Sequence, residues 1–215
     1  MKDIRAIALN IRRTIRSYPY IIYMSSESVD FKDVIEAGCN DFLEKPIDLK
    51  GIEQKVKNAK HILTMMARIN DDSEDFPSAG GVIAKSAFNQ LFLSAIDRGT
   101  RYNERSYVLS IGIENYHEIK SLDGAYNADY ASSKLAYHLV RLRRQSDVIG
   151  QTGAHEFSLL LQRTQNKNEA EEASKRFAVA LEEINDIQPA ESGKIRLYIR
   201  LTGLPGGQLM YEHHI

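Results

Sequence analysis

Arg144 and Asp147, three residues apart, have the side-chain chemistry needed to bind a guanine nucleotide. A guanidinium group binds phosphate, or the O6/N7 edge of guanine, through two parallel hydrogen bonds. A nearby carboxylate can accept hydrogen bonds from the N1–H and N2–H₂ groups of the same base. The spacing also fits a helix end followed by a turn, where Arg suits the helix dipole and Ser146 and Asp147 cap the turn. The pair therefore predicts either a nucleotide site or a structural turn.

The segment that follows Asp147 must position this pair. Val148-Ile149 is a short apolar strand, Gly153-Ala154 is a tight turn, and the stretch from Phe157 to Leu161 is a second apolar strand. Two apolar strands joined by a glycine turn predict a β-hairpin.

The turn Gly153-Ala154-His155-Glu156-Phe157, called here the signature turn, resembles the hairpin motif of the GGDEF family. These diguanylate cyclases condense two GTP molecules into the bacterial second messenger cyclic di-GMP. Two of the five motif positions differ. The resemblance implies that residues 80–215 form an antiparallel-centred α/β domain similar to the palm of nucleotidyl cyclases. The buried strand Tyr107 to Ile113 would be its first central strand.

The resemblance also implies that catalysis is lost. The two metal-binding acids of the family fall at Gly112 and His155, and the second acid of its Asp-x-Asp motif falls at Glu114. Phosphoryl transfer of this type needs carboxylates to hold two Mg²⁺ ions, which glycine and histidine do not replace. We therefore expect no catalytic residue, no bound metal and no cofactor.

The nucleotide-base positions of the family are half retained. Lys120 replaces its guanine-reading Asn, whereas Asp129 matches its guanine-reading Asp and is a vestigial base-binding residue. The family's C-terminal helix, with its phosphate-binding Lys, should follow the last strand, but Leu204-Pro-Gly-Gly207 and a short tail stand there instead. We expect this segment to be a turn and not a phosphate loop, because no helix start with Lys-Ser/Thr follows it.

In the family, Arg-x-x-Asp at this distance before the turn is the inhibitory site that binds cyclic di-GMP. The resemblance therefore assigns Arg144 and Asp147 to that ligand. Further basic candidates for the same site are Arg141, Arg143, Lys175 and Arg176.

The first part of the chain resembles the C-terminal half of a flavodoxin-like response-regulator receiver. Ile4, Ile7, Ile11 and Ile15 have helical spacing, and the segment then predicts strand 20–24, helix 31–37 and strand 41–46. In the receiver family, the residues at Ser25 and Lys45 contact a phosphoryl group, and Phe42 is the switch aromatic. The metal ligands and the phosphate-accepting Asp would precede Met1, so we expect a pseudo-receiver without phosphorylation chemistry. A half sheet with an open edge should pack on another surface, most simply a second copy.

A connecting helix, expected over residues 48–69, carries apolar residues that alternate in steps of three and four. They are Leu49, Ile52, Val56, Ala59, Leu63 and Met66. This heptad seam predicts a stalk that associates with itself, although the same residues could cover the receiver sheet. The expected domains are a truncated pseudo-receiver with its stalk (1–69), a linker (70–79) and a degenerate GGDEF domain (80–215).

Composition limits the class of protein. The chain of 215 residues has a formal net charge of −1, which gives no general electrostatic case for nucleic acid. A single cysteine and the absence of a membrane-length apolar run or signal segment predict a cytoplasmic protein without membrane insertion.

Three functions follow from these observations. The first is a non-catalytic cyclic di-GMP receptor, a homodimer that relays binding to an unidentified signalling or scaffold protein. The second is a nucleotide-independent interaction scaffold with an exposed apolar patch near the shortened sheet. The third, residual cyclase activity, is the least favoured because both metal acids are absent.

Overall fold

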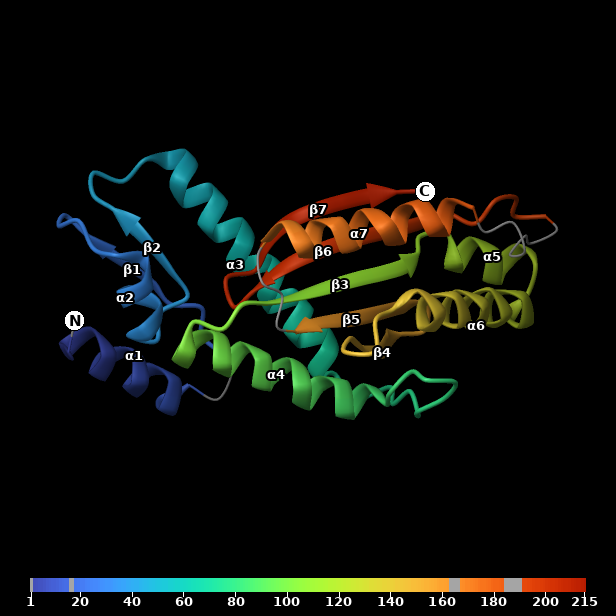
Figure 1. Cartoon of the computed structure of the whole chain (residues 1–215), viewed down its shortest axis with the longest axis horizontal. Coiled ribbons are helices and arrows are strands. Elements are labelled where there is room, and N and C mark those ends of the chain that lie inside the picture. Colours follow the sequence, from blue (N-terminus) through green and yellow to red (C-terminus); the bar gives the residue numbers. More distant parts are fainter. Residues whose placement is uncertain (1, 16–17, 163–166, 184–190) are drawn as a thin grey trace.

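The computed structural model describes residues 2–15, 18–162, 167–183 and 191–215, which form two β-sheets joined by a long helix (Figure 1). The smaller sheet has the order β1-β2 and the larger one the order β4-β5-β3-β6-β7. The small sheet lies at one end of the molecule, and the large sheet with its helices fills the rest. The mixed α/β class and the antiparallel five-stranded sheet expected for the second part are confirmed.

The N-terminal unit consists of α1 (Lys2–Thr14), β1 (Ile22–Ser25), α2 (Phe31–Glu36) and β2 (Asp41–Glu44). Its strands are parallel, as expected, and the Lys45 N–H donates to the Ser25 carbonyl at 2.7 Å. Ser25 and Lys45, the two positions that the receiver resemblance assigns to phosphoryl contact, therefore lie at adjacent strand ends. The helix expected from the spacing of Ile4, Ile7, Ile11 and Ile15 is α1, which ends at Thr14, one residue before the last of these positions.

The connecting helix α3 (Leu49–Asn70) packs on both units. It begins at Asp48, whose carboxylate accepts from the backbone N–H groups of Lys50 and Gly51, both at 3.1 Å. Near the N-terminal unit, Lys55 forms an ion pair of 2.5 Å with the buried Asp41. Farther along, Ile62, Met65, Met66 and Ile69 are buried against the large sheet and α4. The helix is thus part of the core beside the sheet.

The five-stranded sheet consists of β3 (Ser106–Ile113), β4 (Val148–Gly153), β5 (Glu156–Gln162), β6 (Leu197–Leu204) and β7 (Gln208–His214). Strand β3 is central and buried along its whole length. Because side chains alternate between the faces of a strand, Leu109 and Ile111 face one layer of helices while Val108 faces the other.

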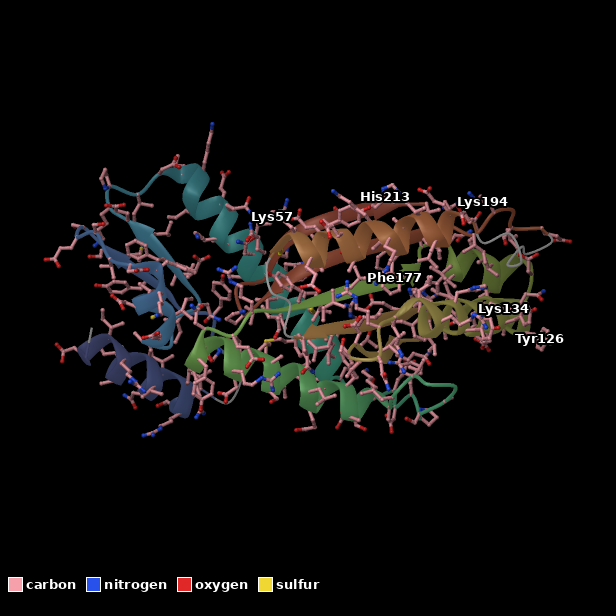
Figure 2. The ribbon with its side chains drawn as sticks, in the orientation of Figure 1. Lys57, Tyr126, Lys134, Phe177, Lys194 and His213 are labelled. Atoms are coloured by element: carbon pink, nitrogen blue, oxygen red, sulfur yellow. The ribbon has the colours of Figure 1, made fainter. Side chains whose placement is uncertain are left out.

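Helices cover both faces of this sheet. The first layer contains α5 (Tyr116–Leu122), α6 (Ala125–Leu142) and α7 (Lys167–Glu182). Phe177 of α7 projects into this layer, where it is fully buried (Figure 2). The second layer contains α3 and α4 (Lys85–Tyr102), which bury Phe88 and Phe92. The buried apolar residues of this face are therefore covered by α3 and α4.

The Leu204–Gly207 segment is the turn between β6 and β7, as predicted, and it joins the two units. A Cβ atom on Gly207 would lie 2.5 Å from the Asn58 carbonyl oxygen of α3, and the φ of +75° at this glycine also disfavours a side chain. The Tyr20 hydroxyl of the N-terminal unit donates to the Gly206 carbonyl at 2.8 Å. The turn is therefore held against both α3 and the N-terminal unit.

Candidate functional site

The signature turn lies at the end of the β4–β5 hairpin, beside the end of β3. The hairpin prediction is confirmed, with a register irregularity between Gln151 and Gly153. The Ile113 N–H donates to the His155 carbonyl at 2.9 Å, and Gly112 pairs with Glu156 across β3 and β5. The fold thus brings together the two positions that the family resemblance assigns to metal binding.

Glu156, the fourth residue of the signature turn, is a buried carboxylate bonded entirely within the protein. The Arg68 guanidinium of α3 lies 2.5 Å from one of its oxygens, and the Tyr198 hydroxyl donates to the same oxygen. The other oxygen accepts from the Thr152 hydroxyl at 2.7 Å. A buried carboxylate requires such compensation, because burial without it is very unfavourable. The positive charge that neutralises Glu156 at this end of the sheet is therefore the guanidinium of Arg68.

Serine and threonine hydroxyls extend this network beneath α3. Thr152 lies 3.1 Å from the Ser158 hydroxyl, which in turn lies 3.2 Å from that of Ser110. A cavity of about 110 Å³ remains beside the network, and the residues that line it are His61, Thr64, Met65, Arg68, Ser110, Glu156, Tyr198 and Arg200. Burial, together with the nearby Arg200 and Arg68 charges, lowers the pKa of His61. The cavity is therefore polar but is lined by charges that already have partners.

Tyr198 fills the space in which a side chain at position 112 would lie. A Cβ atom built on Gly112 would be 2.5 Å from the Tyr198 hydroxyl oxygen and 2.6 Å from its Cζ atom. Burial, followed by the Glu156 charge, strongly raises the pKa of Tyr198, so the hydroxyl remains a hydrogen-bond donor. The backbone at position 112 therefore has room for hydrogen only.

His155 lies in an aromatic group and not among metal ligands. Its ring stacks on Tyr116 with centroids 4.8 Å apart and meets His117 edge-on at 5.4 Å. Burial lowers the pKa of His155, and the neighbouring His117 lowers it further. In the described part of the chain, no group of three or more His, Cys, Asp and Glu side chains is arranged to hold a metal ion. These residues do not fit the two Mg²⁺ ions of a cyclase.

The remaining base-site positions lie on α5 and α6. Lys120 is exposed on α5, and Asp129 on α6 accepts from the Tyr116 hydroxyl at 2.8 Å. Burial and this hydrogen bond raise the pKa of Tyr116 to about 12. Glu114 is exposed and contacts His214 of β7. Lys120 and Asp129 therefore lie on two helices that pack on each other, α5 and α6.

Arg144 and Asp147 share a pocket of about 450 Å³ between the hairpin and α7. Its lining residues are Arg144, Ser146, Asp147, Leu161, Gln162, Glu169 and Ala173. Arg144 is about half exposed and forms an ion pair of 2.5 Å with Glu169 of α7. Among the described residues, the pocket therefore presents one guanidinium and two carboxylates.

Asp147 is buried, with 6% of its surface exposed, and its carboxylate has two hydrogen-bond donors among the described residues. Its side chain accepts from the Arg144 backbone N–H at 3.2 Å and from the Ser146 hydroxyl at 3.5 Å. Burial raises the pKa of Asp147 from its ordinary value, and the Arg144 contacts offset this only in part. The turn interpretation thus holds in part, since Asp147 caps the backbone of this loop, but the described residues use only part of the carboxylate's hydrogen-bonding capacity.

The other basic candidates differ in how close they lie to the pocket of Arg144 and Asp147. Arg143 donates to the Asp147 carbonyl at 3.0 Å and so holds the loop, whereas Arg141 donates to the Tyr137 hydroxyl at 3.0 Å on the exposed side of α6. Arg176 is close enough to lower the pKa of Asp147. Lys175 lies next to it in sequence but on a different side of α7 from Ala173, which lines the pocket. Arg176 is therefore the better placed of the two α7 residues.

Sequence reasoning missed three residues that shape these sites. They are Arg68, Tyr198 and Glu169, none of which was expected as a site residue. No local pattern indicates them, because Arg68 and Glu156 are 88 positions apart and Glu169 is 25 positions from Arg144.

The chain has no helix among its described residues that combines the length and the apolar character needed to cross a membrane.

Comparison with known proteins identifies one family and several similar solved structures. The family model described as "Diguanylate cyclase, GGDEF domain" matches residues 78–203, more than half of the chain. No curated protein matches the sequence.

Among solved structures, the chain is similar to the diguanylate cyclase SiaD of Pseudomonas aeruginosa in complex with its activator SiaC, at 17% identity and a TM-score of 0.52. That match covers 74% of this chain and 62% of SiaD, so this chain spans less than two thirds of the other protein. The GGDEF domain of DgcB from Caulobacter crescentus, in complex with c-di-GMP, matches at 13% identity and a TM-score of 0.49, over 65% of this chain and 84% of that one. The GGDEF domain of PA1120 (YfiN or TpbB) from Pseudomonas aeruginosa matches at 20% identity and a TM-score of 0.47, over 56% and 74%.

The SiaD match agrees with the antiparallel five-stranded fold, and the family model places the signature turn within its matched range. The chain therefore belongs to the GGDEF domain family of diguanylate cyclases, a family of cyclic di-GMP signalling.

Proposed function

We propose that this protein is a non-catalytic receptor for cyclic di-GMP that binds the dinucleotide at Arg144 and Asp147. The observation that carries the proposal is the buried, poorly compensated carboxylate of Asp147 in a pocket shared with Arg144. A buried ionisable group that costs stability and faces a pocket is a common mark of a functional site. Guanine supplies the two N–H donors that such a carboxylate lacks here.

The expected contacts follow from the chemistry of the two side chains. The Arg144 guanidinium would bind a phosphate or the guanine O6/N7 edge, and Asp147 would accept from guanine N1–H and N2–H₂. Arg176 on α7 would add positive charge beside the phosphates. Arg144 must first exchange its ion pair with Glu169 for the ligand, so binding includes a rearrangement of this side chain.

Loss of cyclase activity is the second part of the proposal. The space beside Gly112 is filled by Tyr198, and the carboxylate of Glu156 is neutralised by Arg68. A metal ion at this end of the sheet would have to displace an arginine and would gain one carboxylate, which is too few for a two-metal site. Both observations support a domain that binds nucleotide without converting it.

Relay to a protein partner is the third part. The N-terminal unit and the sheet share α3 and the β6–β7 turn, so a partner on the N-terminal unit would contact a body joined to the ligand-binding domain. SiaD, which is similar in fold, is in complex with an activator protein, and this provides a precedent for a protein partner on a GGDEF protein. Ligand binding would then change either the surface that the partner contacts or the affinity of the partner for this protein.

One observation favours the alternative, a scaffold that needs no nucleotide. Glu169 already holds Arg144 at 2.5 Å and places a negative charge in the pocket. A phosphate must overcome that charge to bind. Absence of any affinity for guanine nucleotides would support the scaffold.

A thermal shift experiment tests the proposal. Cyclic di-GMP at about 100 times its dissociation constant should stabilise the protein by about 2.7 kcal/mol, which corresponds to a rise in melting temperature of about 5–10 °C for a chain of this size. Arg144→Ala should lose the shift. Arg196→Ala should keep it, because Arg196 forms a comparable exposed ion pair, with Glu118, outside the pocket. GTP with Mg²⁺ should yield no cyclic di-GMP, and detectable product would refute the non-catalytic part.

A further inference from the structure

Helix α3 carries an apolar stripe that the described part of the chain covers only in part. Leu49, Val56 and Leu63 recur every seven residues and are 77%, 56% and 37% exposed. Residues seven apart drift by only about 20° around a straight helix, so the three side chains lie in one line. Ile52 and Ala59 are half-buried and lie between them along the helix. These five residues are called here the outer stripe.

The outer stripe is distinct from the face of α3 that enters the core. That face consists of Ile62, Met65, Met66 and Ile69, which pack beneath the sheet. Met66, the last residue of the predicted heptad seam, belongs to this buried face. The seam available to another molecule therefore ends at Leu63. Lys57, from the same part of α3, is exposed.

We propose that the outer stripe is a dimer interface in which α3 packs antiparallel against α3 of a second copy. In this arrangement Ile52 lies opposite the partner's Leu63, and Val56 lies opposite the partner's Ala59. Each contact occurs twice, because a two-fold axis relates the copies and makes the interface self-complementary. Every residue of the outer stripe in these pairs thus packs against another residue of the outer stripe, contributed by the second copy.

The charges beside the stripe select this orientation. Glu53 and Lys60 are exposed and follow Ile52 and Ala59 by one position each, so they flank the stripe on the same side. In the antiparallel pair, Glu53 lies beside the partner's Lys60, and the opposite charges meet twice. In a parallel pair in register, Glu53 would lie near the partner's Asp48. Lys60 would likewise lie near the partner's Lys55, so like charges would meet at both places.

The dimer does not depend on nucleotide binding, because the outer stripe and the Arg144 pocket lie on different elements. Its contact covers about two heptads, which is small for a stable interface, so the dimer should dissociate on dilution.

Analytical ultracentrifugation of the full chain over a range of concentrations tests the association. The wild type should pass from monomer to dimer as the concentration rises, and Val56→Asp should stay monomeric. Val179→Asp is the matched control, since Val179 is an equally exposed valine on α7, at 58%, and this variant should associate like the wild type. Thermal melting checks that each variant is folded. A wild type that is monomeric throughout, or a Val56→Asp variant that still forms dimers, would overturn the proposal.

Charge reversal and crosslinking test the orientation. Glu53→Lys and Lys60→Glu should each weaken the dimer, and the double variant should restore it. Ile52→Cys and Leu63→Cys should form a disulfide only when mixed, because two copies of residue 52 would lie about 16 Å apart along the antiparallel pair. The native Cys39 is buried and leaves the result readable. Self-linked Ile52→Cys without mixed product would indicate parallel helices and overturn the assignment.

Discussion

Replacing Arg68 by Met removes the guanidinium that neutralises the buried carboxylate of Glu156. The Arg68 side chain is 40% exposed and that of Glu156 only 5%, so the carboxylate stays buried when its partner is lost. Removing one partner of a fully buried ion pair costs about 3–5 kcal/mol. Water can reach the vacated position, and Tyr198 and Thr152 still donate to the carboxylate, so we expect a cost of about 2–3 kcal/mol. For a chain of this size, the melting temperature should fall by about 5–10 °C.

Urea and thermal denaturation of four proteins measure this effect. Wild type, Arg68→Met, Glu156→Gln and the double variant form a double-mutant cycle. Because the two side chains are in direct contact, we expect their contributions to the free energy of unfolding to be coupled by at least about 1 kcal/mol. Arg101→Met is the matched control. It removes an arginine from an exposed ion pair with Asp97 and should cost less than about 1 kcal/mol. If Arg68→Met costs no more than this control, the guanidinium is not the counter-ion of a buried carboxylate, and the argument about the metal site fails.

Three further predictions concern the same two sites. Gly112→Asp should destabilise the fold by at least about 1–3 kcal/mol and should not restore cyclase activity, because Tyr198 occupies the space; product formation by this variant would contradict the account. Asp147→Asn should be more stable than wild type at about pH 7 and lose that advantage near about pH 3, since a carboxyl group whose pKa is raised by folding stabilises the protein only while it is protonated. Denaturation across this range checks it, and an advantage independent of pH would count against the burial argument. Glu169→Gln should tighten cyclic di-GMP binding several-fold by releasing Arg144, as measured by titration; weaker binding would show that Glu169 assists the ligand.

The hairpin and the central strand could be predicted from the sequence because their signals are local. Apolar runs on either side of Gly153-Ala154 define two strands and a turn, and the order of elements from Tyr107 onward follows the resemblance to one family. The Arg144–Asp147 pair was identified by its side-chain chemistry and by the resemblance to the family's Arg-x-x-Asp site, and the fold places both residues in one pocket. Whether that pocket binds a ligand stays a prediction.

The surroundings of the two positions that the resemblance assigns to metal binding could not be predicted, because they depend on strand register. The sequence indicates that Gly112 lacks a ligand atom, but only the pairing of Gly112 with Tyr198 across β3 and β6 shows that a ring fills the space. Arg68 belongs to a helix whose heptad pattern indicated a stalk. That helix has two apolar faces, and a seven-residue pattern does not reveal which of them enters the core. The expected domain limits and the receiver resemblance stay predictions.

Calorimetric titration of cyclic di-GMP into the protein tests the central claim most directly. The account predicts saturable binding to the wild type with micromolar or tighter affinity, about −8 kcal/mol or stronger at 25 °C, and its loss in Arg144→Ala but not in Arg196→Ala. Binding that survives Arg144→Ala would place the nucleotide elsewhere. The absence of binding heat at two temperatures, in wild type and variants alike, would contradict the receptor and leave the scaffold as the better account.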